Sequence, residues 1–191
     1  MNLSDPHIED YEDDFFEKID IDSESLSGKN FQDCHFKNCR FSDCDFSYSV
    51  FRNCVFDNCE LTIIKVNSTG FSNCEFKECR LRGMNFSDCN GYQFYSDFSE
   101  SIIGQCYFSE FDLKNKSFYK CRIQNSEFAK TILTGANFRE VDFTDTIFSG
   151  CNLEKADFSR ARGYNMHPGE NKMKGAIFTY PDVVNLLSPL G

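Results

Sequence analysis

The stretch from Phe31 to Leu61 reads F-QDCH-F-KNCR-F-SDCD-F-SYSV-F-RNCV-F-DNCE-L, with a large apolar residue at every fifth position. The same spacing continues to Phe86 and then, displaced by two residues, runs from Phe98 to Phe158. The position two residues before each large one mostly holds a small residue, and all eleven cysteines of the chain occupy this small position. A fixed repeat sustained over about 130 residues predicts a solenoid, in which each repeat buries its apolar face only by stacking on its neighbours.

A period of five matches neither an α-helix nor a plain β-strand, whose apolar residues return after three to four and after two positions. The inward positions are spaced alternately by two and three, as in Cys34, Phe36, Cys39 and Phe41. The step of two suits a short extended segment with both side chains on one face. The step of three must contain a corner, and Asn, Asp, Ser and Gly supply the turns. The chain is therefore expected to wind around a filled axis.

The cysteines have two interpretations. Thiols on neighbouring coils would lie close together, which would permit disulfides or a ladder of metal ligands. However, their number is odd, the usual zinc spacings are absent, and Ser49, Thr69 and Ala136 hold the same position. A buried thiol behaves as a compact apolar group. We therefore favour a packing role, with free thiols in a reducing, cytoplasmic compartment.

The (small)-x-(Phe/Leu)-x-x units resemble the pentapeptide-repeat family over about residues 28–162. The resemblance implies an all-β fold, a right-handed quadrilateral parallel β-helix with four repeats in each coil. A short helix is expected near the C-terminus. The phenylalanines expected to fill the structural core are Phe36, Phe41, Phe56, Phe76, Phe108, Phe128, Phe138 and Phe148.

Two terminal segments differ from the repeats. Residues 1–27 hold ten acids and one lysine, so nearly all of the net charge of −10 lies there, and residues 28–191 carry only −1. We interpret residues 1–27 as an acidic lead-in that caps the first coil, because an open solenoid edge invites aggregation. A solubilising, partly disordered leader is the alternative.

The second differing segment is the tail, residues 163–191, in which Pro181 suits the first turn of a helix that ends before Pro189. Its apolar residues exceed what so short a tail can bury alone, which predicts a helical dimerisation module. A hydrophobic cap over the last coil is the alternative. The candidate dimer-interface residues are Phe178, Val183, Val184, Leu186, Leu187 and Leu190.

The repeat is interrupted at about residues 89–97, where two residues too many separate Phe86 from Phe98. One interpretation is a bulge between two stacks of coils, and the other is a protruding loop that contacts a partner, since loops that break a regular scaffold often carry function. Phe111 and Lys116, too large for the small position, mark further places where the coil opens or tilts. The candidate partner-contact residues, which include acids of later coils, are Tyr92, Phe94, Tyr95, Asp97, Glu100, Asp142 and Asp145.

The sequence contains no recognisable catalytic constellation. His7, His35 and His167 belong to no nucleophile or metal motif, and neither a phosphate-binding loop nor a dinucleotide-binding glycine pattern is present. We expect no enzymatic activity, no cofactor and no metal. No apolar run approaches the ~20 residues of a membrane span, and the N-terminus lacks the pattern of a signal peptide. A filled rod offers surface, so the expected function is binding of another macromolecule.

Within this family the layout resembles the topoisomerase-protecting branch, which includes the Qnr quinolone-resistance proteins and the microcin B17 immunity protein. The resemblance rests on a short lead-in containing Glu17-Lys18-Ile19-Asp20, two repeat blocks with one break, and a tail with Asn165-Met166-His167-Pro168 and Pro181 to Leu187. It implies a homodimer that mimics DNA and binds DNA gyrase or topoisomerase IV, countering quinolones or peptide toxins without binding nucleic acid itself. Physically, such a mimic presents acids to a basic groove, yet no face of the predicted coil is strongly acidic.

The alternative function is an interaction scaffold that is unrelated to topoisomerases and docks another protein through exposed apolar residues. The residues that would carry this docking are Tyr48, Ile63, Ile102, Tyr107, Ile132 and Ile147.

Overall fold

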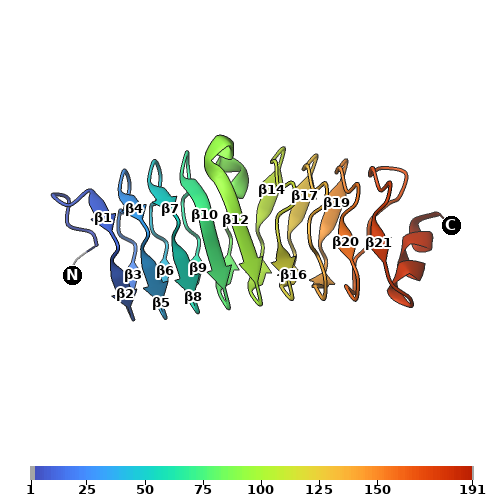
Figure 1. The fold of residues 1–191 in the computed structure, drawn as a ribbon, viewed down its shortest axis with the longest axis horizontal. Helices are drawn as coiled ribbons and strands as arrows, with labels where there is room; N and C mark the ends of the chain where they lie inside the picture. The colour runs from blue at the N-terminus through green and yellow to red at the C-terminus, as the bar shows by residue number, and fades with distance from the viewer. Residues whose placement is uncertain (1–2, 191) are drawn as a thin grey trace.

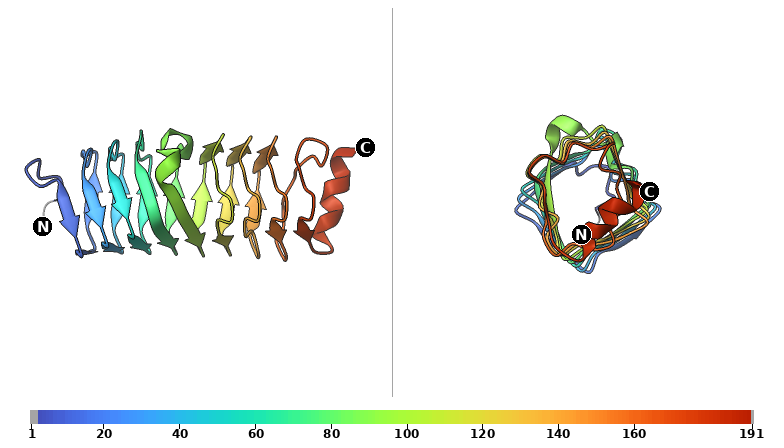
Figure 2. Two further views of the ribbon diagram at one scale, coloured as in Figure 1. Left: turned by 45° about the horizontal axis from the view of Figure 1, so that its top comes forward. Right: turned by 90° about the vertical axis from the view of Figure 1, so that its right-hand side faces the viewer.

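A computed structural model describes residues 3–190, without the side chains of residues 188–190. The chain winds into a straight rod of about eight turns, with its two ends at opposite ends of the rod (Figure 1). Viewed from the end, the rod has a four-sided outline (Figure 2). All strand pairs are parallel and join residues about twenty positions apart, as in Phe36↔Phe56 and Leu61↔Leu81. The prediction of a parallel β-helix with twenty residues per coil is confirmed.

The strands of each face are short and repeat once per coil. Face one contains β1 (Asp10–Glu12), β4 (Asn30–Gln32), β7 (Val50–Arg52) and the first half of β10 (Gly70–Lys77). Face two contains β2 (Phe15–Glu17), β5 (His35–Lys37), β8 (Val55–Asp57), the second half of β10, β15 (Phe118–Tyr119), β20 (Asp157–Phe158) and β21 (Ile177–Phe178). Strand β12 (Phe94–Ser99), like β10, contributes to both faces.

Face three is a single seven-stranded sheet. It contains β3 (Asp20–Asp22), β6 (Arg40–Ser42), β9 (Glu60–Thr62), β11 (Arg80–Arg82), β13 (Ile102–Gly104), β16 (Arg122–Gln124) and β18 (Asp142–Thr144). Face four contains β14 (Tyr107–Ser109), β17 (Glu127–Ala129) and β19 (Ile147–Ser149), and isolated bridges such as Asp45↔Lys65 continue it before the break.

The corners have left-handed backbone, which few side chains adopt readily. Asn38 and Asn58, at equivalent corners of successive coils, have φ of 53° and 50°. Asn tolerates this conformation better than most residues. Asn58 Nδ2 also donates a hydrogen bond to Asn38 Oδ1 at 2.7 Å. The corner residues thus satisfy the backbone geometry and bond one coil to the next.

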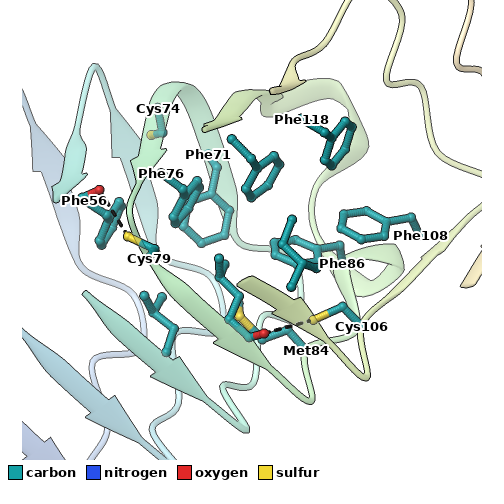
Figure 3. Close-up of a cluster of buried hydrophobic side chains, with 14 of the residues drawn as sticks. Phe56, Phe71, Cys74, Phe76, Cys79, Met84, Phe86, Cys106, Phe108 and Phe118 are labelled. Carbon is teal, nitrogen blue, oxygen red and sulfur yellow. Dashed lines mark hydrogen bonds between the residues drawn. The ribbon is translucent and has the colours of Figure 1, made fainter. Parts of the chain in front are cut away.

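Aromatic rings stacked along the axis fill the rod (Figure 3). The rings of Phe36 and Phe56 lie 4.7 Å apart and almost parallel, and those of Phe108 and Phe128 lie 4.8 Å apart. Neighbouring columns meet edge to face, as Phe128 and Phe138 do at 82°. All eight phenylalanines assigned to the core are buried. Each coil thereby covers the rings of the coil before it.

All eleven cysteines are free and buried. Cys54 Sγ donates to the carbonyl of Phe31, on the preceding coil, at 3.4 Å, and Cys79 Sγ donates in the same way to Phe56 at 3.2 Å. Burial raises the pKa of Cys121 to about 12 and that of Cys106 to about 11. These thiols are therefore neutral packing groups near pH 7.

The solenoid extends beyond residues 28–162 at both ends. Tyr11 and Phe16 continue the five-residue spacing and stack on Phe31 and Phe36. Strands β1 to β3 therefore form a first coil within the segment assigned to a cap, and residues 3–9 cover it, with Leu3 buried. At the other end β21 pairs with β20, so the last coil reaches Phe178. The predicted boundaries missed the first coil because acids such as Glu9 and Asp14 stand at its small positions, and they missed the last coil because Gly163 and Met173 depart from the Phe/Leu pattern.

The described residues contain no helix long and apolar enough to span a membrane.

Candidate interaction surface

The break between Phe86 and Phe98 forms a protrusion on the side of the rod. Two short 3-10 helices, η1 (Phe86–Asp88) and η2 (Gly91–Gln93), precede β12. The side chains of Asn85 and Asn90 cap them by accepting hydrogen bonds from the backbone of Ser87 and Tyr92. The end view shows this segment extending beyond the outline of the coils (Figure 2). The two extra residues are thus held in a defined, capped structure.

Beside the insertion, the register between β10 and β12 shifts by one residue. Strand β10 pairs with β12 from Phe71↔Phe94 onward, but the register shifts between Ser72 and Cys74, leaving Asn73 unpaired. β-Bulges bend a strand and re-aim its side chains, and they occur next to functional sites. The break therefore combines an irregularity between two stacks of coils with a protruding segment, and contact of this segment with a partner stays a prediction.

An aromatic groove of about 520 Å³ lies beside this protrusion. Tyr92 is 94 % exposed and Tyr95 is 56 % exposed. Buried Phe111 contacts Phe94 edge to face at 4.8 Å and lies near the floor of the groove. The lining is completed by Gly91, Glu110, Asp112, Lys114 and Lys116. We call this surface the break groove; it combines exposed aromatic rings with charges of both signs.

Six groove residues were not among the predicted contacts: Gly91, Glu110, Phe111, Asp112, Lys114 and Lys116. Lys116 Nζ lies 5.4 Å from the centre of the Tyr95 ring, a cation–π arrangement. Phe111 occupies a position that elsewhere holds a small residue, and it packs against the interrupted coil. The mismatch of Phe111 and Lys116 with the repeat was the sequence signal, and it pointed to this opening of the coil without identifying the groove.

Phe94 corrects one of the predicted partner contacts. Its side chain is only 1 % exposed, so it cannot contact a partner. The backbone of Phe94 pairs with Phe71, and its ring packs against Phe86 and Phe111. The physical reason is that an interrupted coil still needs a large apolar residue in its core, and Phe94 supplies it in place of Gly91.

The acidic candidates do not gather at the break groove. Asp97, on β12, uses its carboxylate to accept a hydrogen bond from the Ser117 backbone at 2.6 Å. Glu100 is exposed at the next corner. Asp142 lies on face three two strands beyond Ile102, and Asp145 is exposed at the corner that follows it. The predicted contact residues therefore divide into an aromatic group at the break and acids on other faces.

The last coil and η3 (Asp182–Leu190) form an apolar end to the rod. Helix η3 lies across this end (Figure 2). Phe178 stacks on Phe158 at 5.0 Å, and Leu186 packs against the core. Val184 and Leu187 are 52 % and 62 % exposed, and Val183 is half-buried. The Leu190 side chain lies outside the described part of the structure. The tail therefore covers the last coil and still exposes apolar side chains.

The acidic residues near the N-terminus belong to the solenoid itself. Nine carboxylates lie between Glu9 and Glu24, on and around the first coil. Each exposed position of β1 and β3 carries an acid. The first coil is consequently the most acidic part of the rod, while the faces of later coils mix both signs of charge.

The described residues 3–187 contain no group of three or more His, Cys, Asp or Glu side chains placed to hold a metal ion.

Two sequence models of one family match the chain: the pentapeptide repeat region over residues 29–95 and pentapeptide repeats, in eight copies, over residues 121–160. A search of curated proteins gives no match.

The fold is similar to that of QnrB1, a plasmid-mediated fluoroquinolone resistance protein. One trypsin-treated variant of QnrB1 aligns over 100 % of this chain and 92 % of its own, with a TM-score of 0.70 and 18 % identity. A second trypsin-treated variant aligns over 93 % of this chain and 98 % of its own, with a TM-score of 0.68 and 14 % identity. Since the two family models together cover more than half of the chain and its coils have the corresponding architecture, the chain belongs to the pentapeptide-repeat family.

Proposed function

We propose that this protein binds a type II topoisomerase, DNA gyrase or topoisomerase IV, and protects it from quinolones or peptide toxins. The observation that carries the proposal is the likeness to QnrB1, which extends over the whole chain and nearly the whole of that protein. A common repeat alone would not carry it. The alignment runs through the coils on both sides of the break.

The proposed mechanism is occupation of a DNA-binding surface by the acidic end of the rod. The carboxylates between Glu9 and Glu24 present a dense negative charge, as phosphates do in a duplex. A basic groove would attract this end at long range, and salt would weaken the attraction. Faces of later coils carry mixed charge, so the proposal assigns the mimicry to the first coil and not to the rod as a whole.

The proposed active form is a homodimer joined through the apolar end. Val184 and Leu187 expose apolar surface beside a helix that already covers the last coil. One self-complementary patch suffices for a two-fold dimer. Joining two rods at this end would leave both acidic coils at the far ends of the particle.

The dimer proposal is tested by sedimentation of the double variant Val184→Asp, Leu187→Asp. These residues are exposed in one chain, so the variant should fold normally and sediment as a monomer. The matched control is Ile177→Asp, an exposed apolar residue on β21, which should remain dimeric. A dimer that survives the double substitution contradicts the proposed interface.

The break groove is the proposed specificity contact, since electrostatic attraction alone does not distinguish one basic partner from another. Its exposed tyrosines suit a protein interface, because their rings contribute large contact area at low conformational entropy cost. The acid end would thus bring the partner close, and the break groove would contact one particular surface.

Binding by purified gyrase, measured by fluorescence anisotropy of the labelled protein, tests the proposed partner. We expect affinity to fall steeply between 50 and 200 mM salt, since that dependence characterises contacts that replace phosphates. Duplex DNA should compete with the protein. Failure of gyrase to bind the folded protein at low salt would refute the proposal.

The second candidate is an interaction scaffold unrelated to topoisomerases, and it is favoured by exposed apolar side chains away from the break. Tyr48, Ile63 and Ile147 are 69 %, 58 % and 57 % exposed. A scaffold of this kind would bind its partner without strong salt dependence. In both cases we propose a cytoplasmic protein that acts by binding without catalysis.

A further inference from the structure

One column of face three carries charges of alternating sign. In each strand of face three, the residue before the buried central one pairs in register with the equivalent residue of the next coil. Along the rod these residues are Asp20, Arg40, Glu60, Arg80, Ile102, Arg122, Asp142 and Arg162. An acid and a base follow each other at every step except at Ile102, where an acid is due. Opposite charges on adjacent strands stabilise a sheet, so the exception stands out.

At the Arg162 end of this column, two arginines lie close to the carboxylate of Asp142. Arg162 Nη2 donates to Asp142 Oδ2 at 2.8 Å, and Arg122 Nε lies 3.9 Å from the same oxygen. Each arginine is one coil away from Asp142, on opposite sides. A carboxylate at such a position is thus approached by both guanidinium groups.

Arg80 and Arg122 flank Ile102 in the same register as Arg122 and Arg162 flank Asp142, but no carboxylate lies between them. We call these three residues the Arg80–Ile102–Arg122 frame. Ile102 is half-buried, and Gly104 beside it leaves the surface open. Two hollows meet at Ile102: one, of about 470 Å³, is lined by Arg80, and the other, of about 430 Å³, is lined by Arg122. Among the described residues 3–187, no side chain lies within ion-pair or hydrogen-bonding distance of the Arg80 guanidinium, although Glu60 is its neighbour in the column.

We infer that the Arg80–Ile102–Arg122 frame is a docking site for an acidic segment of a partner protein. An aspartate or glutamate carboxylate of that segment would lie between the two guanidinium groups, while its aliphatic part packs on Ile102. Guanidinium groups match the geometry of carboxylates and can bind them through paired hydrogen bonds. This site is independent of the proposed topoisomerase partner.

The rest of the column favours a single carboxylate over a nucleic acid. A duplex carries a charge about every 1.7 Å along its axis. Its phosphates would therefore also meet Glu60 and Asp142, which flank the frame in the same column. A protein segment can place one acid over Ile102 and uncharged residues over its neighbours.

The strongly acidic first coil does not prevent this binding. Asp20 and Ile102 are four strands apart on face three, or roughly 19 Å at about 4.8 Å per strand. The Debye length at physiological ionic strength is about 8 Å. The acids of the first coil are therefore largely screened from a partner at the frame.

A fluorescein-labelled hexapeptide with one glutamate among uncharged residues, titrated with the full chain at 50 mM salt, tests the inference by anisotropy. We expect Ile102→Glu to weaken binding at least about tenfold, because the new carboxylate would lie between Arg80 and Arg122 as that of Asp142 lies between Arg122 and Arg162. The pair Arg80→Gln, Arg122→Gln should weaken it similarly. Arg40→Gln is the matched control: that arginine already pairs with Asp20 at 2.7 Å, so its loss should change affinity less than about twofold.

The same titration can overturn the inference in two ways. Equal affinities in all variants, or no binding by the unaltered chain, would show that the frame is not a carboxylate site. Displacement of the peptide by inorganic phosphate or duplex DNA, at concentrations as low as those of the unlabelled peptide, would assign the frame to phosphate instead.

A stability measurement supplies a readout that needs no partner. Ile102→Glu should unfold at a Tm about 1 to 4 °C above that of Ile102→Gln, because only the glutamate can pair with both arginines. The difference should shrink in 1 M salt. A glutamate variant no more stable than the glutamine variant would contradict the geometry assigned to the frame.

Discussion

The block of coils before the break and the block after it have one architecture but differ in the chemistry of their small positions. Seven of the eleven cysteines lie before the break and Cys89 lies within it, while the later block mostly has Ser, Thr and Ala at these positions. Cys54 Sγ before the break donates to the carbonyl of the residue 23 positions earlier, at 3.4 Å, and Thr146 Oγ1 after it does the same at 3.0 Å. Thiol and hydroxyl thus fill one role. The fold requires a compact side chain there, preferably one that donates to the preceding coil.

The large positions of the two blocks show no such difference. Truncating a buried phenylalanine should therefore have the largest effect on stability in either block. Phe128→Ala after the break and Phe36→Ala before it should each destabilise the protein by about 3–5 kcal/mol, since both rings are buried between rings of adjacent coils. Urea unfolding followed by circular dichroism measures both. A variant as stable as the unaltered protein would show that its ring is not a core ring.

Enlarging a small position should have the next largest effect. Cys54→Leu should cost about 1–3 kcal/mol through overpacking against the preceding coil. Cys54→Ser, which installs the group used in the later block, should cost less because the hydroxyl can donate to the Phe31 carbonyl. If thermal unfolding finds serine as damaging as leucine, the equivalence of the two blocks fails.

Alkaline pH should destabilise the protein through its buried thiols. Burial raises the pKa of Cys121 to about 12, above the 9.0 of an ordinary thiol. Above pH 9 the unfolded chain loses this proton while the folded chain keeps it, so stability that is constant at lower pH falls as pH rises. The slope is about 1.4 kcal/mol per pH unit for each such cysteine until its folded pKa is reached. Tm measured between pH 7 and pH 11 should be flat at first and then fall, and Cys121→Ala should reduce the fall. A flat profile up to pH 11 contradicts the burial.

The smallest effect on stability is expected at the break groove. Tyr92→Ala should change the free energy of unfolding by less than about 0.5 kcal/mol, because the side chain is 94 % exposed. It should nevertheless weaken partner binding if the groove is a contact. Tyr48→Ala, an exposed tyrosine in the earlier block, is the matched control and should leave binding unchanged. The opposite ranking of the two variants would locate the contact away from the break.

The sequence predicted the core well because each coil repeats the same steric requirement. Phe and Cys at regular spacing are sufficient to place the buried columns from Phe31 to Phe158. The first coil was assigned to a cap because its acids dominate residues 1–27, yet Tyr11 and Phe16 continue the stack. In the first coil, acidic residues point outward while Tyr11 and Phe16 keep the inward spacing. The high density of acids led to the assignment as a cap and hid this spacing.

The surface was harder to predict because it depends on contacts between coils. Phe94 looked like an exposed aromatic residue, but the core of the interrupted coil needed its ring. The column from Asp20 to Arg162 emerges only when residues about twenty positions apart are aligned, and the break shifts that alignment by two. A single sequence gives the period but not where an irregular coil resumes it.

Supercoiling by purified DNA gyrase in the presence of a fluoroquinolone, with and without this protein, tests the proposed function most directly. We expect the folded protein to restore supercoiling at low concentration, with Tyr92→Ala weaker and Tyr48→Ala equal to the unaltered chain. Absence of any rescue by protein whose folding has been verified would contradict the protection account and favour the scaffold function.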